Sequence, residues 1–220
     1  MAARVPAPLL EPFQIAFLAG RARGACETAI VSLAKQGLLR AQPRPDQDGL
    51  FHATGTPPPG AHPLELAVHA AAAQPTHPLY LQMLHSWTVQ RGQAREQAGK
   101  LNKRQRQLIR KFEQQESVKG PLSPGATARS LRYAARPAIG EISSQLQQLG
   151  LMRPGFRGVR RTGHGRAALA ALRDSYQSLK QNAAVDPVLA AAVWDVRVLR
   201  QTQLGEVYDA LRPAVRVGDG

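Results

Sequence analysis

The segment LAKQGLLR at residues 33–40 recurs as LQQLGLMR at residues 146–153. In each copy an apolar helical stretch ends at a glycine, Gly37 or Gly150, and a left-handed glycine is a common helix terminator. Apolar residues and an arginine follow the glycine at once, and this composition favours a short strand. Both copies therefore predict a helix that passes directly into a strand.

The residues around the first copy extend this prediction. Glu11-Pro12 begins a short apolar helix, and Gly20 and Gly24 indicate a turn before a second helix that ends at Gly37. Residues 38–40 and 50–54 are separated by a Pro/Asp/Gly turn, which predicts a β-hairpin. Helix, turn, helix and hairpin is the order of elements in a winged helix.

The second copy has similar surroundings between residues 122 and 172. Aligning Gly150 on Gly37 pairs several other positions: Leu146 with Leu33, Ile142 with Ala29, Ile139 with Cys26, Arg153 with Arg40, and Thr162 with Thr54. The sequence thus predicts a mainly α fold with tandem winged-helix-like units and small β-hairpin wings.

Four segments are predicted along the chain. The first winged-helix-like unit takes residues 1–60, and a helical connector with a basic helix takes 61–120. The second winged-helix-like unit takes 121–180, and C-terminal helices take 181–220. Asp186-Pro187 is a favourable helix start, and residues 205–211 predict a last short helix before Pro213. We expect the C-terminal helices to pack on the second unit.

The basic charge is concentrated in two places. Lys and Arg number 29 against 15 Asp and Glu, which gives a net charge of +14. Residues 91–111 and 129–166 each carry a net +7, so together they hold the whole excess. Such a distribution is typical of a surface that faces a polyanion, although a well-solvated surface in an arginine-rich proteome explains it equally well.

Signatures of catalysis are missing from the sequence. It contains no phosphate-binding glycine loop that ends in Lys-Ser/Thr, no Gly-x-Ser-x-Gly and no His-Glu-x-x-His, so we predict neither an enzyme nor a bound cofactor. Cys26 lies on an apolar helix face and is predicted to be a core residue. The histidine pairs 62/69 and 77/85 would each need a third strong ligand nearby, and carboxylates are scarce there, so no metal site is predicted.

Neither a secretory signal nor a membrane span is expected. Prolines and Glu11 interrupt the first 20 residues, and the longest uncharged stretch, 66–90, contains two prolines with several His and Gln. These features predict a cytoplasmic protein.

Nucleic-acid binding through the second unit is one functional hypothesis. Its second helix is expected to expose Ser143, Ser144, Gln147 and Gln148 to base edges, while the wing contacts phosphates. DNA or another polyanion would be the partner. The predicted contact residues lie in the basic helix, the second helix and the wing: Lys103, Arg104, Arg106, Arg110, Gln147, Gln148, Arg157, Arg160 and Arg161.

A protein-interaction or assembly module is the alternative. The second helix of the first unit is expected to expose a nearly neutral face with Glu27, Thr28, Ser32, Lys35 and Gln36. Such a face suits a protein contact, and the basic stretches would then meet an acidic protein or a membrane-associated partner. The sequence leaves the choice between the two hypotheses open, together with the oligomeric state.

The chain also resembles an uncharacterised bacterial family that is usually described as membrane proteins with a Gly/Cys-rich low-complexity tail. The resemblance rests on short apolar blocks at residues 15–39, 53–55, 62–68, 146–152, 160–172 and 186–211. It implies membrane association but no activity and no catalytic residues. Residues 154–158 stand where members typically carry a membrane hairpin, and the Gly/Cys tail is not present in this sequence.

Overall fold

The computed structural model describes residues 9–43, 49–74, 125–155 and 158–212. Met1–Ala73 and Gly125–Gly220 belong to one compact unit, so both copies of the repeat lie in the same body. The described residues are mainly helical and carry two small antiparallel sheets, which confirms the mainly α prediction.

The first element, α1 (Pro12–Lys35), consists of two helical stretches joined across a kink, in agreement with the predicted order of helix, turn and helix. The kink lies at Arg21, whose φ of 57° and ψ of −151° are not helical. After the kink the chain returns close to its own first half, because a Cβ on Gly24 would lie 2.6 Å from the carbonyl oxygen of Ala16. The predicted turn between Gly20 and Gly24 is therefore present as a sharp kink at Arg21, with no loop between the two helical stretches.

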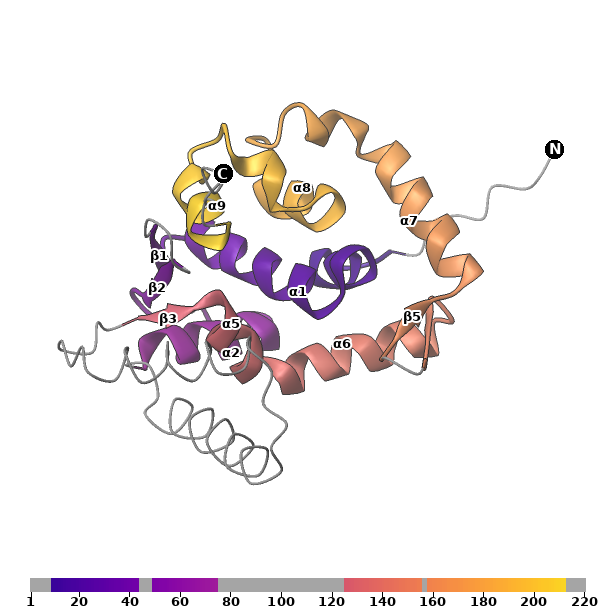
Figure 1. Cartoon of the computed structure of the whole chain (residues 1–220), viewed down its shortest axis with the longest axis horizontal. Coiled ribbons are helices and arrows are strands. Elements are labelled where there is room, and N and C mark those ends of the chain that lie inside the picture. Colours follow the sequence, from indigo (N-terminus) through magenta and orange to yellow (C-terminus); the bar gives the residue numbers. More distant parts are fainter. Residues whose placement is uncertain (1–8, 44–48, 75–124, 156–157, 213–220) are drawn as a thin grey trace, which may run out of the picture. The chain divides into compact units, whose positions relative to one another are not determined.

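Helix α1 forms the centre of the core, and every residue from 25 to 33 is buried. Helix α8 (Pro187–Trp194) packs along it, and helices α2 (Pro63–Ala73), α5 (Ala128–Ala134) and α6 (Arg136–Gln148) also contact it. Figure 1 shows α1 between α8 and the α5–α6 pair. The prediction that Glu27, Thr28 and Ser32 are exposed is wrong, because all three side chains are buried.

Two of the three buried polar side chains of α1, Glu27 and Ser32, have partners far away in the sequence. Ser32 Oγ donates a hydrogen bond of 2.6 Å to Glu65 Oε1 on α2. Glu27 accepts from Arg23 Nε at 2.7 Å, and from Arg212 through both guanidinium Nη atoms at 2.7 and 3.1 Å. The buried Thr28 hydroxyl has no hydrogen-bond partner in the described part of the chain.

The first sheet has three strands in the order β1 (Leu39–Gln42), β2 (Leu50–Ala53) and β3 (Ala126–Thr127). Strands β1 and β2 form the predicted hairpin, with Arg40 opposite His52. Strand β3 immediately precedes α5, yet it pairs with β2, so that Phe51 lies opposite Ala126. The second repeat therefore completes the sheet of the first.

The second sheet is a two-stranded hairpin of β4 (Met152–Arg153) and β5 (Arg160–Arg161). It follows α6 just as β1 follows α1. Gly37 and Gly150 both adopt a positive φ, 71° and 67°. The same three hydrogen bonds surround each glycine, so the repeat seen in the sequence corresponds to a repeated helix-to-strand junction.

Those bonds match position by position. Leu38 N donates to Leu33 O at 2.8 Å, and Leu151 N donates to Leu146 O at 3.0 Å. Thr54 N and Thr162 N donate to Leu38 O and Leu151 O, each at 3.0 Å. The Thr54 hydroxyl donates to Gly37 O at 2.6 Å, and the Thr162 hydroxyl donates to Gly150 O at 2.7 Å.

The second hairpin is followed by α7 (Gly163–Ser175) and the 3₁₀ helix η1 (Gln177–Lys180). The C-terminal helices are α8, the 3₁₀ helix η2 (Val196–Leu199) and α9 (Gly205–Leu211). Asp186 caps α8 by accepting from Leu189 N at 3.2 Å, as the sequence predicts. The packing expectation is only partly met, because α8 contacts α7 but packs chiefly on α1.

Three of the four leucines that the repeat places in the core, at positions 33, 38, 146 and 151, are fully buried. Leu33, Leu146 and Leu151 have no exposed surface, whereas Leu38 is only partly buried against the core. Trp194 also has a packing role, since its Nε1 donates to Tyr176 O at 3.1 Å and its ring lies beneath Arg173 and Lys180.

Candidate functional site

Helices α5 and α6 form a tight two-helix pair joined by the single buried residue Ala135. Thr127 begins α5, where its side chain accepts a hydrogen bond of 3.3 Å from Ser130 N. Leu131 and Ile142 are almost fully buried and hold the pair against the core. One side of α6 is thereby fixed, and the opposite side faces solvent.

The solvent side of α6 carries a stripe made of Pro137, Glu141, Ser144 and Gln148, called here the α6 stripe. All four residues are exposed, and their spacing places them on one helix face. The helix has 13 residues and is therefore about 20 Å long. The α6 stripe is polar except for Pro137, and its only charge is Glu141.

Two of the residues predicted to face bases lie off this stripe. Ser143 is buried, so its predicted exposure is wrong. Gln147 is half-buried, and its Nε2 donates to Ser143 O and Ser143 Oγ, both at 3.3 Å. Ser144 and Gln148 are exposed, although the Ser144 hydroxyl donates to Gly140 O at 3.1 Å.

The hairpin β4–β5 places two arginines directly opposite each other. Arg153 on β4 is the cross-strand partner of Arg160 on β5, and both side chains are exposed. Like charges at such positions destabilise a hairpin. Neither arginine forms an ion pair within the described part of the chain. The hairpin therefore presents two uncompensated positive charges, called here the arginine pair.

Arg161 differs from its neighbour, because it connects the hairpin to the core. It is half-buried, and its Nη2 donates to Ala19 O on α1 at 3.2 Å. Burial lowers the pKa of Arg161, and the charges of Arg173, Arg21 and Arg166 lower it further. Of the two predicted wing contacts on β5, Arg160 is thus the free one and Arg161 is held against α1.

The first repeat offers no comparable surface among the described residues. Residues 25–33 of α1 are buried, so this helix has no face that reaches solvent along that length. In the β1–β2 hairpin, Arg40 lies opposite His52 rather than another arginine. The Nε2 atom of His52 lies 3.1 Å from Gln42 Oε1. Within the described chain, the second repeat is the one that combines an open helix face with a cationic hairpin.

The remaining predicted contacts, Lys103, Arg104, Arg106, Arg110 and Arg157, lie outside the described residues. Arg153 was not among the predicted contacts, although the match between the two repeats pairs it with Arg40. The signal that identifies it is strand register, because Arg153, the last residue of β4, lies opposite Arg160 on β5. Sequence spacing alone does not fix that register.

Cys26 is a core residue, as predicted. It is 2% exposed. Burial raises the pKa of its thiol from 9.0 to about 12, and Glu27 adds to this increase. The thiol is therefore protonated at neutral pH and does not act as a nucleophile there.

Metal-binding and membrane-spanning features are both missing from the described residues. These residues contain no group of three or more His, Cys, Asp or Glu side chains arranged to hold a metal ion. Among them, no helix combines the length and the apolar character that crossing a bilayer requires.

The chain was compared with protein-family models, with curated proteins and with solved structures. None of these comparisons gives a match, so the family resemblance noted from the sequence stays a prediction.

Proposed function

We propose that this protein binds duplex DNA without catalysing a reaction on it, with α6 in the major groove and the β4–β5 hairpin on the sugar-phosphate backbone. The observation that carries the proposal is the arginine pair. Two like charges face each other in a two-stranded hairpin at a cost to stability, and no carboxylate of the described chain compensates them. Phosphates of a bound duplex would supply the missing negative charge.

The finer fold inference is that α5, α6, β4 and β5 form a helix-turn-helix with a wing. In this motif the second helix enters the groove while the first crosses the backbone. Helix α1 with β1 and β2 is then a second copy that has become an internal scaffold, since its equivalent helix is buried. The matched junctions at Gly37 and Gly150 support this inference.

The α6 stripe has the chemistry for contacts with base edges. The amide of Gln148 can pair with adenine, and Ser144 can donate to or accept from several bases. Glu141 can accept from the amino group of cytosine. A helix of this diameter fits the major groove, which is about 12 Å wide. Arg136, exposed at the start of α6, would lie near the backbone.

A salt titration of DNA affinity tests this proposal. The full chain is titrated against a fluorescent 20-base-pair duplex, and the dissociation constant is measured by anisotropy between about 50 and 300 mM salt. Each phosphate contact changes the log–log slope by about 0.9. We expect Arg153→Ala/Arg160→Ala to weaken binding and to reduce the slope by about 1.8, which is two contacts.

The chain provides a matched control. Arg40→Ala/Arg200→Ala removes the same charge from exposed positions elsewhere, and Arg40 is the counterpart of Arg153 in the first repeat. This variant is expected to keep the wild-type slope. Equal losses in both double variants would mean that binding follows net charge rather than the β4–β5 hairpin.

A second variant examines the helix. Gln148→Ala is expected to change the preference among duplexes of different sequence while leaving the salt slope unchanged, because Gln148 carries no charge. Undetectable binding of the wild-type chain at about 50 mM salt would overturn the DNA proposal, since non-specific binders are normally measurable there. The protein-interaction hypothesis would then take its place.

A further inference from the structure

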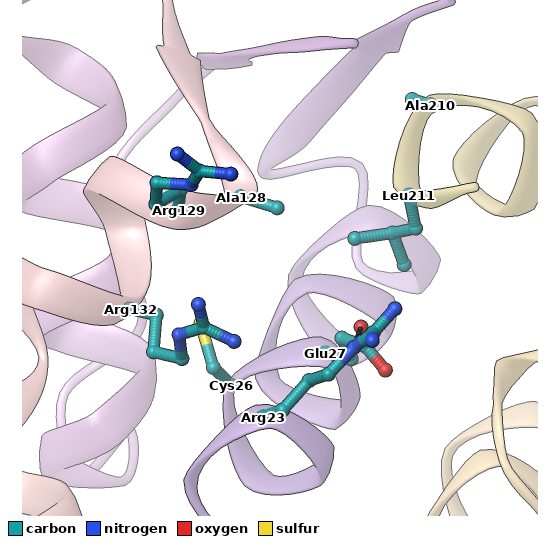
Figure 2. Close-up of a pocket in the computed structure, with 8 residues that line it drawn as sticks. All are labelled: Arg23, Cys26, Glu27, Ala128, Arg129, Arg132, Ala210 and Leu211. Carbon is teal, nitrogen blue, oxygen red and sulfur yellow. Dashed lines mark hydrogen bonds and ion pairs between the residues drawn. The ribbon is translucent and has the colours of Figure 1, made fainter. Parts of the chain in front are cut away.

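A pocket of about 190 Å³ lies between α1, α5 and α9, away from the α6 stripe. Figure 2 shows its lining: Arg23, Cys26 and Glu27 come from α1, Ala128, Arg129 and Arg132 from α5, and Ala210 and Leu211 from α9. Three arginines from two separate chain segments thus border one small cavity. Arg23 and Arg129 are exposed, which leaves the pocket accessible from solvent.

The single carboxylate in the lining is already neutralised. Glu27 Oε1 accepts from Arg23 Nε at 2.7 Å. Arg212 binds both oxygens of the same carboxylate at 2.7 and 3.1 Å. Glu27 is therefore paired with two cations, Arg23 and Arg212, and does not form an ion pair with the arginines on α5.

Arg129 and Arg132 have no such partner among the described residues. They lie three positions apart on α5 and so occupy the same side of the helix. Arg132 is half-buried, and its guanidinium lies beside Cys26 (Figure 2). Neither arginine forms an ion pair in the described part of the chain. Two free guanidinium groups consequently face one cavity.

Cys26 adds no negative charge to the pocket. Burial raises the pKa of its thiol to about 12, so the group remains neutral at physiological pH. A neutral thiol beside Arg132 does not repel an incoming anion, whereas a thiolate would.

We propose that this pocket binds a phosphate group, held by the paired guanidinium groups of Arg129 and Arg132, with Arg23 at its edge. The planar guanidinium fork matches phosphate oxygens and forms short charge-assisted hydrogen bonds. The net lining charge of +2 complements a phosphate dianion. The volume lies below the usual range of about 300–1,000 Å³ for drug-sized ligands, so the ligand is a small phosphate rather than a nucleotide.

The phosphate has two sources to distinguish. It is either free, as inorganic phosphate or a small phosphomonoester, or it belongs to a DNA backbone that reaches α5. The pocket stands independently of the α6 stripe and the arginine pair, because it shares no residue with them. The first arm of its test, thermal unfolding with inorganic phosphate, therefore does not depend on whether the protein binds DNA.

Thermal unfolding of the full chain with inorganic phosphate provides the first arm. Melting temperature is measured from 0 to 20 mM phosphate, with sodium chloride added to hold ionic strength constant. At a concentration ten times the dissociation constant, a specific site raises the melting temperature by about 3–6 °C for a domain of this size. We expect this increase in the wild-type protein and its loss in Arg129→Gln/Arg132→Gln.

Two further variants separate a site from a general effect. Arg40→Gln/Arg200→Gln removes equal charge elsewhere and should keep the phosphate response. Arg132→Lys retains the charge but not the fork, so an intermediate response is expected. Phosphate also stabilises proteins without binding to a site, and that effect would be the same in all variants.

The second arm is the salt slope of DNA binding in Arg129→Gln/Arg132→Gln. A slope reduced by about 0.9, the value for one phosphate, assigns the pocket to a backbone phosphate, and an unchanged slope together with the thermal response assigns it to free phosphate. The proposal is overturned if the phosphate response is equal in all variants and the slope is also unchanged. If the α5 variant fails to fold, isothermal titration of the wild-type protein with phosphate replaces it, and absence of heat at about 20 mM would contradict the site.

Discussion

Leu146 has no exposed surface and lies at the junction of α6 with β4, where its carbonyl accepts the Leu151 amide. Leu146→Ala removes buried methyl groups and leaves a cavity, so we expect the free energy of unfolding to fall by about 2–5 kcal/mol. Urea denaturation followed by circular dichroism measures this change. Leu38→Ala is the control. Because Leu38 is only partly buried, this variant should lose clearly less free energy of unfolding. Equal losses of stability in the two variants would mean that the burial of the leucine does not determine how much its removal destabilises the protein.

Cys26 gives a prediction for alkaline pH. Its pKa is about 12 in the folded chain and 9.0 ordinarily, so the folded state keeps the proton longer than the unfolded state does. This contribution to stability is complete below pH 9 and is lost as the pH rises towards 12. We expect the unfolding free energy of wild type to fall by about 1.4 kcal/mol per pH unit more than that of Cys26→Ala in this window. Parallel pH profiles for the two proteins would contradict the assignment.

The sequence predicts single residues where the signal is local. Leu33 and Leu146 follow from helical spacing before a glycine, and Cys26 follows from its apolar neighbours. Glu27 and Ser32 show the limit of this approach. Their polar side chains predict exposure, but their partners Arg212 and Glu65 lie far along the chain and satisfy them in the core. A single sequence does not show such long-range pairing.

At the scale of elements, the two helix-to-strand junctions should respond alike to mutation. Gly37 and Gly150 adopt a positive φ that a side chain disfavours, and open space surrounds both positions. We expect Gly37→Ala and Gly150→Ala each to destabilise by about 1–2 kcal/mol, and the asparagine variants to lose less. Chemical denaturation of the four variants measures this. A near-zero cost at either glycine would show that the two junctions are not equivalent.

Element boundaries were predictable where turn residues mark them, as for α8 after Asp186 and α9 between Gly205 and Leu211. The kink of α1 was only half predictable. Gly20 and Gly24 indicate a break, but the residue that leaves the helical region is Arg21 between them. The pairing of β2 with β3 had no local signal, because a two-residue strand is too short to show periodicity.

In the candidate site, too, local features were predictable from the sequence and long-range packing was not. Arg160 was predictable from the wing composition, whereas Arg153 required the strand register and the partial burial of Gln147 required the helix packing. The pocket arginines Arg129 and Arg132 belong to a basic stretch that the sequence shows plainly. Their convergence on Glu27 and Cys26 depends on how α5 packs against α1, which composition does not encode.

At the scale of the whole molecule, the two repeats share one core. Buried residues of α1, α2, α5, α6, α8 and α9 belong to a single cluster. We therefore expect a fragment of residues 1–60, the first predicted unit, to remain largely unfolded on its own. Without α8, α9 and α6, the apolar residues at 25–33 would face water. Far-UV circular dichroism and amide hydrogen exchange of the fragment measure this, and a cooperative melting transition would contradict the shared core.

The central position of α1 also has a consequence during synthesis. Its main cover, α8, begins at Pro187, about 150 residues after α1 ends. At about 5–20 residues per second, the ribosome needs roughly 8–30 s to supply that cover. The pairing of β2 with β3 is delayed in the same way, because Ala126, the partner of Phe51, is made some 75 residues later. For this interval the central helix of the described chain lacks its main cover, so its apolar residues are open to chaperones that bind nascent chains.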